Sequence, residues 1–408
     1  MKGFEIGRRG LLGAIVAGGG WAALPQPLRA LTPPASGDGA WQRSAALVRS
    51  YVSDARVPGA VALLGRTGEP FNMTASGRQG LAPDTRPVDA DTLWRVYSMT
   101  KPITGMAAML LVEEGKLALD APVAKHLPEL AAPRVYVDPA KGDESRPAKA
   151  EITLRHLLTH SAGFGYTIIN KGPILKAYME RGLTPGTLSR QQIPGYTDGV
   201  PIPPRDEFLK RLGQVPLLFD PGSGWNYSIA LDVTGLLIER VSGQTLDMFL
   251  AERFFTPLGM TSSFFRVPEA QTARLADNHF VLGGSLMPID PGSASAFSDA
   301  SAFAFGGAGL VCSARDYDRF LAMCLGEGEL DGKRVLKTET ARLAMSNLLP
   351  AAVDTRGTMI AGEGFGAFLD QGGDPAVELL DASVEDRDHA LDVAEDLGLA
   401  GAVASVLL

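Results

Sequence analysis

Apolar residues recur at intervals of three and four along several stretches of the chain, which is the spacing of one helix face. This pattern predicts long helices over residues 41–53, 98–114, 228–242, 248–255 and 314–324, and shorter ones over 153–160 and 206–212. Short apolar runs beside glycines predict strands within residues 59–65 and 306–312, with a further strand after a turn at 65–70. The stretch 173–204 is rich in proline and glycine and is predicted to be mostly loop.

The order of these elements predicts how the chain is divided. Strands are predicted near the start of this series of elements (59–65) and near its end (306–312), whereas helices and loops fill the residues between them. This order is typical of an α/β domain whose chain is interrupted by a mostly helical insertion. We expect a sheet domain from residues 41–118 and 275–366, a mostly helical domain from 119–274, and an atypical acidic tail from 367–408.

The first thirty residues have the pattern of an export signal. The pair Arg8-Arg9 precedes a short apolar run over residues 11–17, and prolines and small residues follow it. Such a charged start is typical of a secretory signal, and adjacent arginines are typical of the bacterial twin-arginine route. The apolar run is too short and too rich in glycine for a fixed membrane anchor. We expect residues 1–30 to direct export to the periplasm or medium without leaving a membrane span, and residues 31–40 to form a linker.

Charge and reactive side chains exclude several classes of function. The 408 residues carry a formal net charge of -8, whereas a nucleic-acid-binding surface would be basic and clustered. Neither the two cysteines, Cys312 and Cys324, nor the five histidines follow a metal-binding pattern. Both cysteines lie in or beside one predicted helix, and we expect buried thiols rather than a disulfide. The sequence predicts no nucleic-acid partner, no metal and no cofactor, and it does not indicate an oligomeric state.

Ser98-Met99-Thr100-Lys101 is the first candidate for catalytic chemistry. Taken alone, this Ser-x-x-Lys sequence is a weak signal, because a serine at this place is equally typical of a helix N-cap. If Ser98 opens the helix, however, Lys101 lies one turn further on and faces the same side. The positive helix end would help to stabilise an oxyanion, and desolvation would favour a neutral amine that accepts the serine proton. These two residues are therefore candidates for a nucleophile and its general base.

Tyr227 is the second candidate. It lies in the sequence WNYS (residues 225–228), between a turn at 220–224 and the helix predicted from residue 228. A tyrosine at such a corner can deliver its hydroxyl into a cleft and act as acid or base beside Lys101. The alternative is an aromatic side chain packed at a helix cap, and the local pattern does not separate the two.

Four segments together resemble the serine β-lactamase and penicillin-binding family. They are LWRVYSMTKPITGMAAMLLVEEGKLALDAPVAKHLPEL (93–130), ITLRHLLTHSAGFG (152–165), FDPGSGWNYSIALDVTGLLIE (219–239) and GGAGLVCSARDYDRF (306–320). They agree with the family in order and spacing, over a region from about residue 42 to about residue 348. The family includes class C β-lactamases, D-alanyl-D-alanine carboxypeptidases and carboxylesterases. The resemblance implies a β-lactamase-like fold, with an antiparallel sheet flanked by helices, a mostly helical domain, and the active site between them.

The resemblance also implies roles for the candidates: Ser98 forms the acyl-enzyme, Lys101 is its base, and Tyr227 relays protons. Class C β-lactamases have an asparagine two residues after the tyrosine, where this chain has Ile229. The form Tyr-Ser-x-Ala-x-Asp, which ends at Asp232, resembles the esterase branch instead. We therefore expect ester substrates, with a β-lactamase, a D-alanyl-D-alanine carboxypeptidase or a D-aminopeptidase as the alternative. The Gly-x-Ser-x-Gly elbow of other α/β-hydrolases is absent from the sequence.

The C-terminal tail departs from the family pattern. The family has a third motif (Lys-Thr-Gly, His-x-Gly or Trp-Gly-Gly) on an edge strand that also supplies one N–H of the oxyanion hole, and this sequence shows none. Gly364-Phe-Gly366 resembles the usual approach to the last strands, but the residues that follow are acidic and helix-like in pattern. Either the tail is divergent and functional, or the reading frame shifts near residues 366–373 and strands are lost, which we favour. Losing one oxyanion donor costs about two to three orders of magnitude in rate.

Two classes of function follow for such a chain. It is either a serine hydrolase, with activity impaired by its tail, or an inactive homologue that still binds acyl or peptidoglycan-like ligands. In both cases the partner is a small ester or amide molecule. Labelling with a fluorophosphonate probe separates the two, because only an activated Ser98 reacts.

Overall fold

The computed structural model describes residues 42–66, 71–142, 144–191, 199–282, 284–353, 355, 358, 365–367 and 402–407. The expected export signal and linker, and residues 368–401 of the tail, lie outside this part. The helices are α3 (Gln42–Ser53), α4 (Thr100–Glu113), α5 (Leu154–Leu158), α6 (Gly172–Met179), α7 (Arg205–Gly213), α8 (Ala230–Ser242), α9 (Leu246–Leu250), α10 (Thr256–Leu258), α11 (Ala314–Leu325) and α12 (Thr338–Ala344). The strands are β1 (Gly59–Arg66), β2 (Asn72–Gly77), β3 (Leu93–Arg95), β4 (Arg134–Tyr136), β5 (Ser145–Pro147), β6 (Ser263–Phe264), β7 (Asn278–Leu282), β8 (Ser285–Asp290), β9 (Val311–Ser313), β10 (Glu329–Leu330), β11 (Lys333–Arg334) and β12 (Ala402–Leu407).

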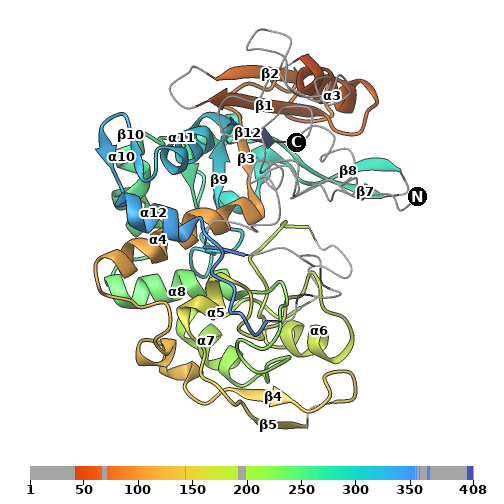
Figure 1. The fold of residues 1–408 in the computed structure, drawn as a ribbon. Helices are drawn as coiled ribbons and strands as arrows, with labels where there is room; N and C mark the ends of the chain where they lie inside the picture. Colours follow the sequence, from red (N-terminus) through yellow and green to blue (C-terminus); the bar gives the residue numbers. More distant parts are fainter. Residues whose placement is uncertain are drawn as a thin grey trace, which may run out of the picture.

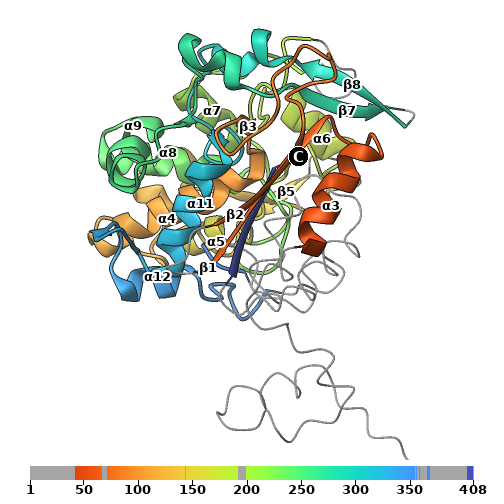
Figure 2. The same cartoon turned by 90° about the horizontal axis from the view of Figure 1, so that it is seen from above.

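Strand β1 is the centre of an antiparallel sheet with the order β12-β1-β2. Its residues alternate between two apolar layers, because successive side chains of a strand point to opposite faces. Ala60 and Ala62 pack with Val48 of α3, whereas Val61 and Leu63 belong to the main core on the other face. Helices α3 and α11 accordingly lie on opposite sides of these strands (Figure 2). The apolar run over residues 59–65 is thus explained by burial on both faces.

Residues 402–407 correct our expectation for the end of the tail. We expected a helix-like tail without the last strands, but these residues form β12, which pairs with β1 from Val61–Leu407 to Arg66–Ala402. The segment contains the β-branched residues Val403 and Val406, which favour extended backbone. The edge of β1 also offers unpaired backbone groups that a strand satisfies. The last residues of the chain therefore contribute to the sheet.

Helix α4 connects the sheet with the mostly helical region around α5, α7 and α8 (Figure 1). Every residue from Thr100 to Leu111 is buried, which is typical of a helix packed on all sides. It contacts α8 on one side and α12 on another. A second small sheet, β3-β9-β6, leads directly into its N-terminus. Lys101, the catalytic candidate on this helix, is therefore held by packing from several directions.

Two further predictions can be compared with the structure. The stretch 173–204, predicted to be mostly loop, contains a helix, α6. Pro173 lies in its first turn, where a fixed φ suits the helix and the missing N–H costs nothing, so proline starts this helix rather than preventing it.

Cys312 on β9 and Cys324 on α11 are both buried free thiols, as expected. In the described part of the chain, no helix is both long and apolar enough to cross a membrane.

Candidate active site

Ser98 lies in a 3₁₀ turn, Tyr97–Met99, between β3 and α4. Neither this turn nor α4 has a side-chain hydrogen bond at its N-cap, so Ser98 does not serve as a helix cap. Tyr97 has a φ of 40°, a left-handed conformation that is uncommon for residues other than glycine. Its hydroxyl accepts a hydrogen bond from Asn278 Nδ2 at 2.6 Å, which helps to hold this strained turn. Burial raises the pKa of Tyr97 to about 12, so its hydroxyl stays protonated.

The structure brings together the three residues that the sequence predicted. Lys101 Nζ donates a hydrogen bond to Ser98 Oγ at 3.0 Å, and Tyr227 Oη donates one to the same oxygen at 2.9 Å. Tyr227 lies in the loop before α8, and its ring centroid is 4.7 Å from Lys101 Nζ. Lys101 is buried, with 8% of its surface exposed. One hydroxyl is thus contacted by an amine and a phenol from two separate elements.

A hydrogen-bonded clamp fixes the lysine from the other side. Lys101 Nζ also donates to the carbonyl of Gly307 at 2.8 Å, and Thr104 Oγ1 donates to the carbonyl of Gly306 at 2.8 Å. The N–H of Gly307 donates in turn to Asp232 Oδ1 on α8 at 2.8 Å. A Cβ on Gly307 would lie 2.5 Å from Asp232 Oδ2, so a larger residue there would push the Asp232 carboxyl group out of its place. The glycine pair therefore ties α4 to α8 directly beside Lys101.

Asp232 is a fully buried carboxyl group. Burial raises its pKa to about 6, an effect that the charge of Lys101 and the N–H of Gly307 partly oppose. Its Oδ2 atom has no hydrogen-bond partner among the described residues. Burying a carboxyl group with so few hydrogen-bond partners costs free energy. Carboxyl groups with pKa values shifted in this way occur most often at functional sites.

His160 supports Tyr227 from behind. Its Nδ1 accepts a hydrogen bond from the N–H of Ser228 at 3.1 Å, and its ring centroid lies 4.6 Å from that of Tyr227. Burial and the charge of Lys101 hold the pKa of His160 well below its usual range. The imidazole is therefore neutral, and within the described structure its Nε2 has no hydrogen-bond partner. These contacts make it a rigid support for the Tyr227 ring rather than a proton carrier.

Residues 365–367 bring the tail to the same place. The ring of Phe365 lies 5.5 Å from His160 and 6.0 Å from Trp225, measured between centroids. The carbonyl of Ala367 lies against Gly105 of α4, where a Cβ would come within 1.9 Å of it. The third motif was sought in the stretch after Gly366. Residues 368–401 of that stretch are not among those that the structure describes.

Sequence reasoning found the Ser98–Lys101–Tyr227 set but not its supports. Asp232 entered only as the last residue of the Tyr-Ser-x-Ala-x-Asp form, and Gly307 only as part of the segment 306–320. The available signal was the spacing: an aspartate five residues after the tyrosine falls on the first turn of α8. Nothing in the sequence near His160 indicated its contact with the Tyr227 ring.

Comparison with known proteins agrees with this geometry. The chain matches the family model described as Beta-lactamase over residues 45–388, a match that passes residue 373 and continues into the tail. It is 36% identical over 289 residues to Esterase EstB of Burkholderia gladioli, covering 65% of each chain. It is 30% identical over 314 residues to the lovastatin esterase of Penicillium rubens, covering 76% of this chain and 73% of that enzyme. The solved structure of EstCE1, "a hydrolase with promiscuous acyltransferase activity", is similar with a TM-score of 0.64 and 26% identity, covering 82% of this chain and 83% of that one.

Proposed function

Because this chain belongs to the β-lactamase family, we propose that it is a serine hydrolase that cleaves carboxylic esters through an acyl-enzyme on Ser98. The observation that carries the proposal is the pair of hydrogen bonds from Lys101 and Tyr227 to Ser98 Oγ. The names of EstB and the lovastatin esterase support ester substrates. The buried position of Ile229, which offers no polar side chain to a β-lactam amide, also favours esters.

The contacts of Lys101 indicate how the serine is activated. A neutral amine has two N–H donors and one lone pair. The ammonium form donates to Ser98 Oγ and must first lose that proton. With another N–H held by the carbonyl of Gly307, the lone pair left behind then faces Ser98 Oγ and can accept its proton. The serine oxygen then attacks the ester carbonyl carbon and forms a tetrahedral intermediate.

Tyr227 is placed to complete the proton transfers. As the ester C–O bond breaks, its hydroxyl gives a proton to the leaving alkoxide and recovers one from Lys101. Water then attacks the acyl-enzyme, and its proton returns to the same pair of residues. The carboxylic acid leaves and Ser98 Oγ regains its proton, so that the cycle is balanced.

The test compares ester and β-lactam turnover by the full chain. We expect hydrolysis of p-nitrophenyl butyrate, loss of that activity in Ser98→Ala, and little nitrocefin turnover. Ser293→Ala is the matched control, because Ser293 is exposed and distant in sequence from the candidate residues. Fast nitrocefin turnover without ester cleavage would favour the β-lactamase alternative. A folded wild-type protein whose Ser98 takes no fluorophosphonate label would instead support the inactive binding homologue.

We also propose that the protein is exported by the twin-arginine route. The proposal is supported by Arg8-Arg9 and the apolar run after them. In a bacterial host, replacing both arginines by lysines should leave the full chain in the cytoplasm, as shown by fractionation. Unchanged periplasmic delivery of that variant would contradict the proposed route.

A further inference from the structure

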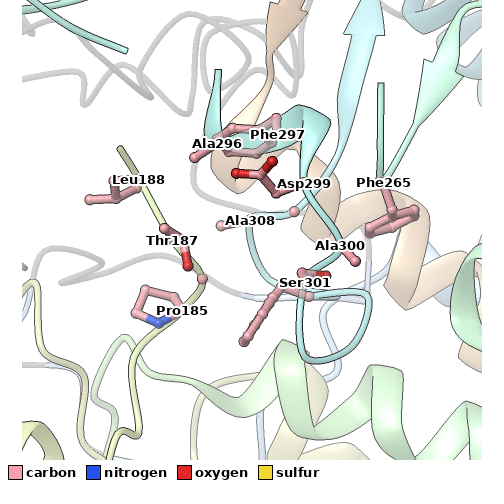
Figure 3. Close-up of a pocket in the computed structure, with 13 residues that line it drawn as sticks. Pro185, Thr187, Leu188, Phe265, Ala296, Phe297, Asp299, Ala300, Ser301 and Ala308 are labelled. Atoms are coloured by element: carbon pink, nitrogen blue, oxygen red, sulfur yellow. The ribbon is translucent and has the colours of Figure 1, made fainter. Parts of the chain in front are cut away.

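A pocket lined partly by aromatic residues includes in its wall Ala308, the residue that follows Gly307 in the sequence (Figure 3). It has a volume of about 230 Å³ and lies between the loop 185–188 and residues 296–301. Phe265, Phe305 and Ala308 complete its walls. Figure 3 shows Pro185, Thr187 and Leu188 on one side of the pocket and residues 296–301 on the other. We call this the aromatic pocket.

The walls of the aromatic pocket are directly connected to the catalytic residues on both sides. Ala308 follows Gly307, whose carbonyl accepts the hydrogen bond from Lys101. On the other side, the ring of Phe297 meets the ring of Tyr97 edge-on, 6.2 Å between centroids, and Tyr97 precedes Ser98. Lys101 Nζ lies 3.0 Å from Ser98 Oγ and 2.8 Å from the Gly307 carbonyl oxygen, and neighbouring Cα atoms are about 3.8 Å apart, so the backbone of Ala308 begins within roughly 10 Å of Ser98 Oγ. A group several bonds away from the scissile carbonyl can therefore reach it.

The chemistry of the lining favours an apolar group. Three phenylalanines and three alanines line the pocket together with two hydroxyl-bearing residues, Thr187 and Ser301, and one charged residue, Asp299. The Ser301 hydroxyl already donates to the carbonyl of Phe303 at 2.6 Å, and Asp299 pairs with Arg190 through hydrogen bonds of 2.6 and 2.8 Å. This carboxylate is thus already compensated by a partner and has little need of a cationic ligand. An apolar cavity of about 150 Å³ holds benzene, so a pocket of this size has room for a phenyl ring or a branched alkyl group.

We propose that the aromatic pocket binds a terminal aryl or branched alkyl group of the ester and thereby selects esters of medium length. The inference rests on the proposed esterase function, because it assigns the substrate class of that same site. It holds for a group on either side of the ester, and the two cases are separated by measurement.

Three esters test the preference. Ethyl 4-phenylbutanoate carries the ring on its acyl side, 4-phenylbutyl acetate is its isomer with the ring on the alcohol side, and ethyl butanoate has no ring. We expect at least one isomer to show a kcat/KM at least tenfold above that of ethyl butanoate, since an apolar pocket discriminates by about 10- to 200-fold per small group. The preferred isomer identifies the side that enters the pocket. Equal kcat/KM for all three esters would overturn the inference.

Filling the pocket should remove the preference. Thr187→Phe changes an exposed residue at the pocket mouth, and Ala308→Leu changes a buried residue of the inner wall. In both variants we expect the ratio of kcat/KM between the preferred phenyl ester and ethyl butanoate to fall at least fivefold. Ala302→Leu is the matched control, because Ala302 is exposed and does not line the pocket. An unchanged ratio in a folded Thr187→Phe protein would count against the pocket.

A binding measurement separates this inference from the proposed function. Ser98→Ala is titrated calorimetrically with N-ethyl-4-phenylbutanamide and with N-(4-phenylbutyl)acetamide, which carry the ring on the acyl side and on the amine side. The Thr187→Phe substitution is then added to Ser98→Ala. If at least one amide binds Ser98→Ala and its affinity falls at least fivefold in the double variant, the pocket is supported even if the wild-type protein hydrolyses no ester. If the wild-type protein hydrolyses esters but neither amide binds more weakly after Thr187→Phe, the proposed function is retained and the pocket is rejected.

Discussion

Replacing Asp232 tests whether this carboxyl group holds Lys101 in place through Gly307. Asp232 accepts the N–H of Gly307, and the carbonyl of the same glycine accepts Lys101 Nζ, each at 2.8 Å. In Asp232→Ala, the N–H of Gly307 loses its acceptor in a fully buried position, which costs about 1–3 kcal/mol. The glycine pair can avoid this cost only by moving, and its carbonyl then moves away from the lysine.

The expected effect on catalysis follows from the same energy. If 1–3 kcal/mol separates the clamped and unclamped positions of Lys101, kcat falls by roughly 5- to 150-fold. KM should change little, because Asp232 is fully buried and has no exposed surface with which to touch a substrate. Asp232→Asn keeps an oxygen acceptor for Gly307 and should recover most of the lost kcat. A residue with a merely structural role would not show this split between kcat and KM.

The assay measures kcat and KM for p-nitrophenyl butyrate together with the melting temperature of each variant. Asp247→Ala is the control, because this carboxylate is exposed on α9 and should leave both constants unchanged. An unaltered kcat in Asp232→Ala would refute the clamp. Equal losses in folded Asp232→Ala and Asp232→Asn would show that the negative charge matters rather than the hydrogen bond.

Three other predictions concern Tyr227, the titration of Asp232, and Arg95. Tyr227→Phe keeps the ring contact with His160 but removes the hydroxyl. The kcat for p-nitrophenyl butyrate should therefore fall by about 10²- to 10⁴-fold, while the melting temperature stays near that of the wild type. An unchanged kcat would leave Lys101 as the sole proton carrier. Because burial raises the pKa of Asp232 to about 6, its contribution to the free energy of unfolding is present below about pH 4 and is lost as the pH rises through about 6. Urea titrations should therefore show the wild type losing about 3 kcal/mol relative to Asp232→Asn over this range, and a constant difference would contradict the raised pKa. Arg95→Met removes the cation that donates to buried Asp290 at 2.7 Å and should cost about 3–5 kcal/mol in urea unfolding, with part recovered by adding Asp290→Asn; a loss below 1 kcal/mol would contradict this.

The catalytic set was predictable because its signals are local. Ser98 and Lys101 lie one helical turn apart, and Tyr227 lies at a turn marked by glycine and proline, so short patterns identify them. The contact between Asp232 and Gly307 joins residues 75 positions apart, and it depends on how α8 packs against α4. No local pattern encodes such packing, and the same holds for the pairing of β12 with β1.

Helix α6 and strand β12 are the two elements that the sequence patterns did not predict. Residues 173–179 contain a proline that the sequence pattern treats as a loop signal, although the first turn of a helix accepts it. Residues 402–407 follow an acidic stretch, and their strand forms against β1, far away in the sequence. In both cases tertiary context decides between conformations that the local residues permit equally.

Ile229 provides a test of why this site differs from that of class C β-lactamases, which have asparagine at the corresponding place. The side chain of Ile229 is fully buried in the main core, at the N-cap of α8. Ile229→Asn loses the burial of an isoleucine, about 1.5–3 kcal/mol, and buries an amide that needs new partners, about 1–3 kcal/mol more. We therefore expect a lower melting temperature and no gain of nitrocefin turnover, whereas Ile229→Val should lose only about 0.5–1.5 kcal/mol. A stably folded Ile229→Asn protein with at least tenfold faster nitrocefin turnover would show that this side chain can turn toward a substrate, and that one residue, rather than the packing around it, sets the ester preference.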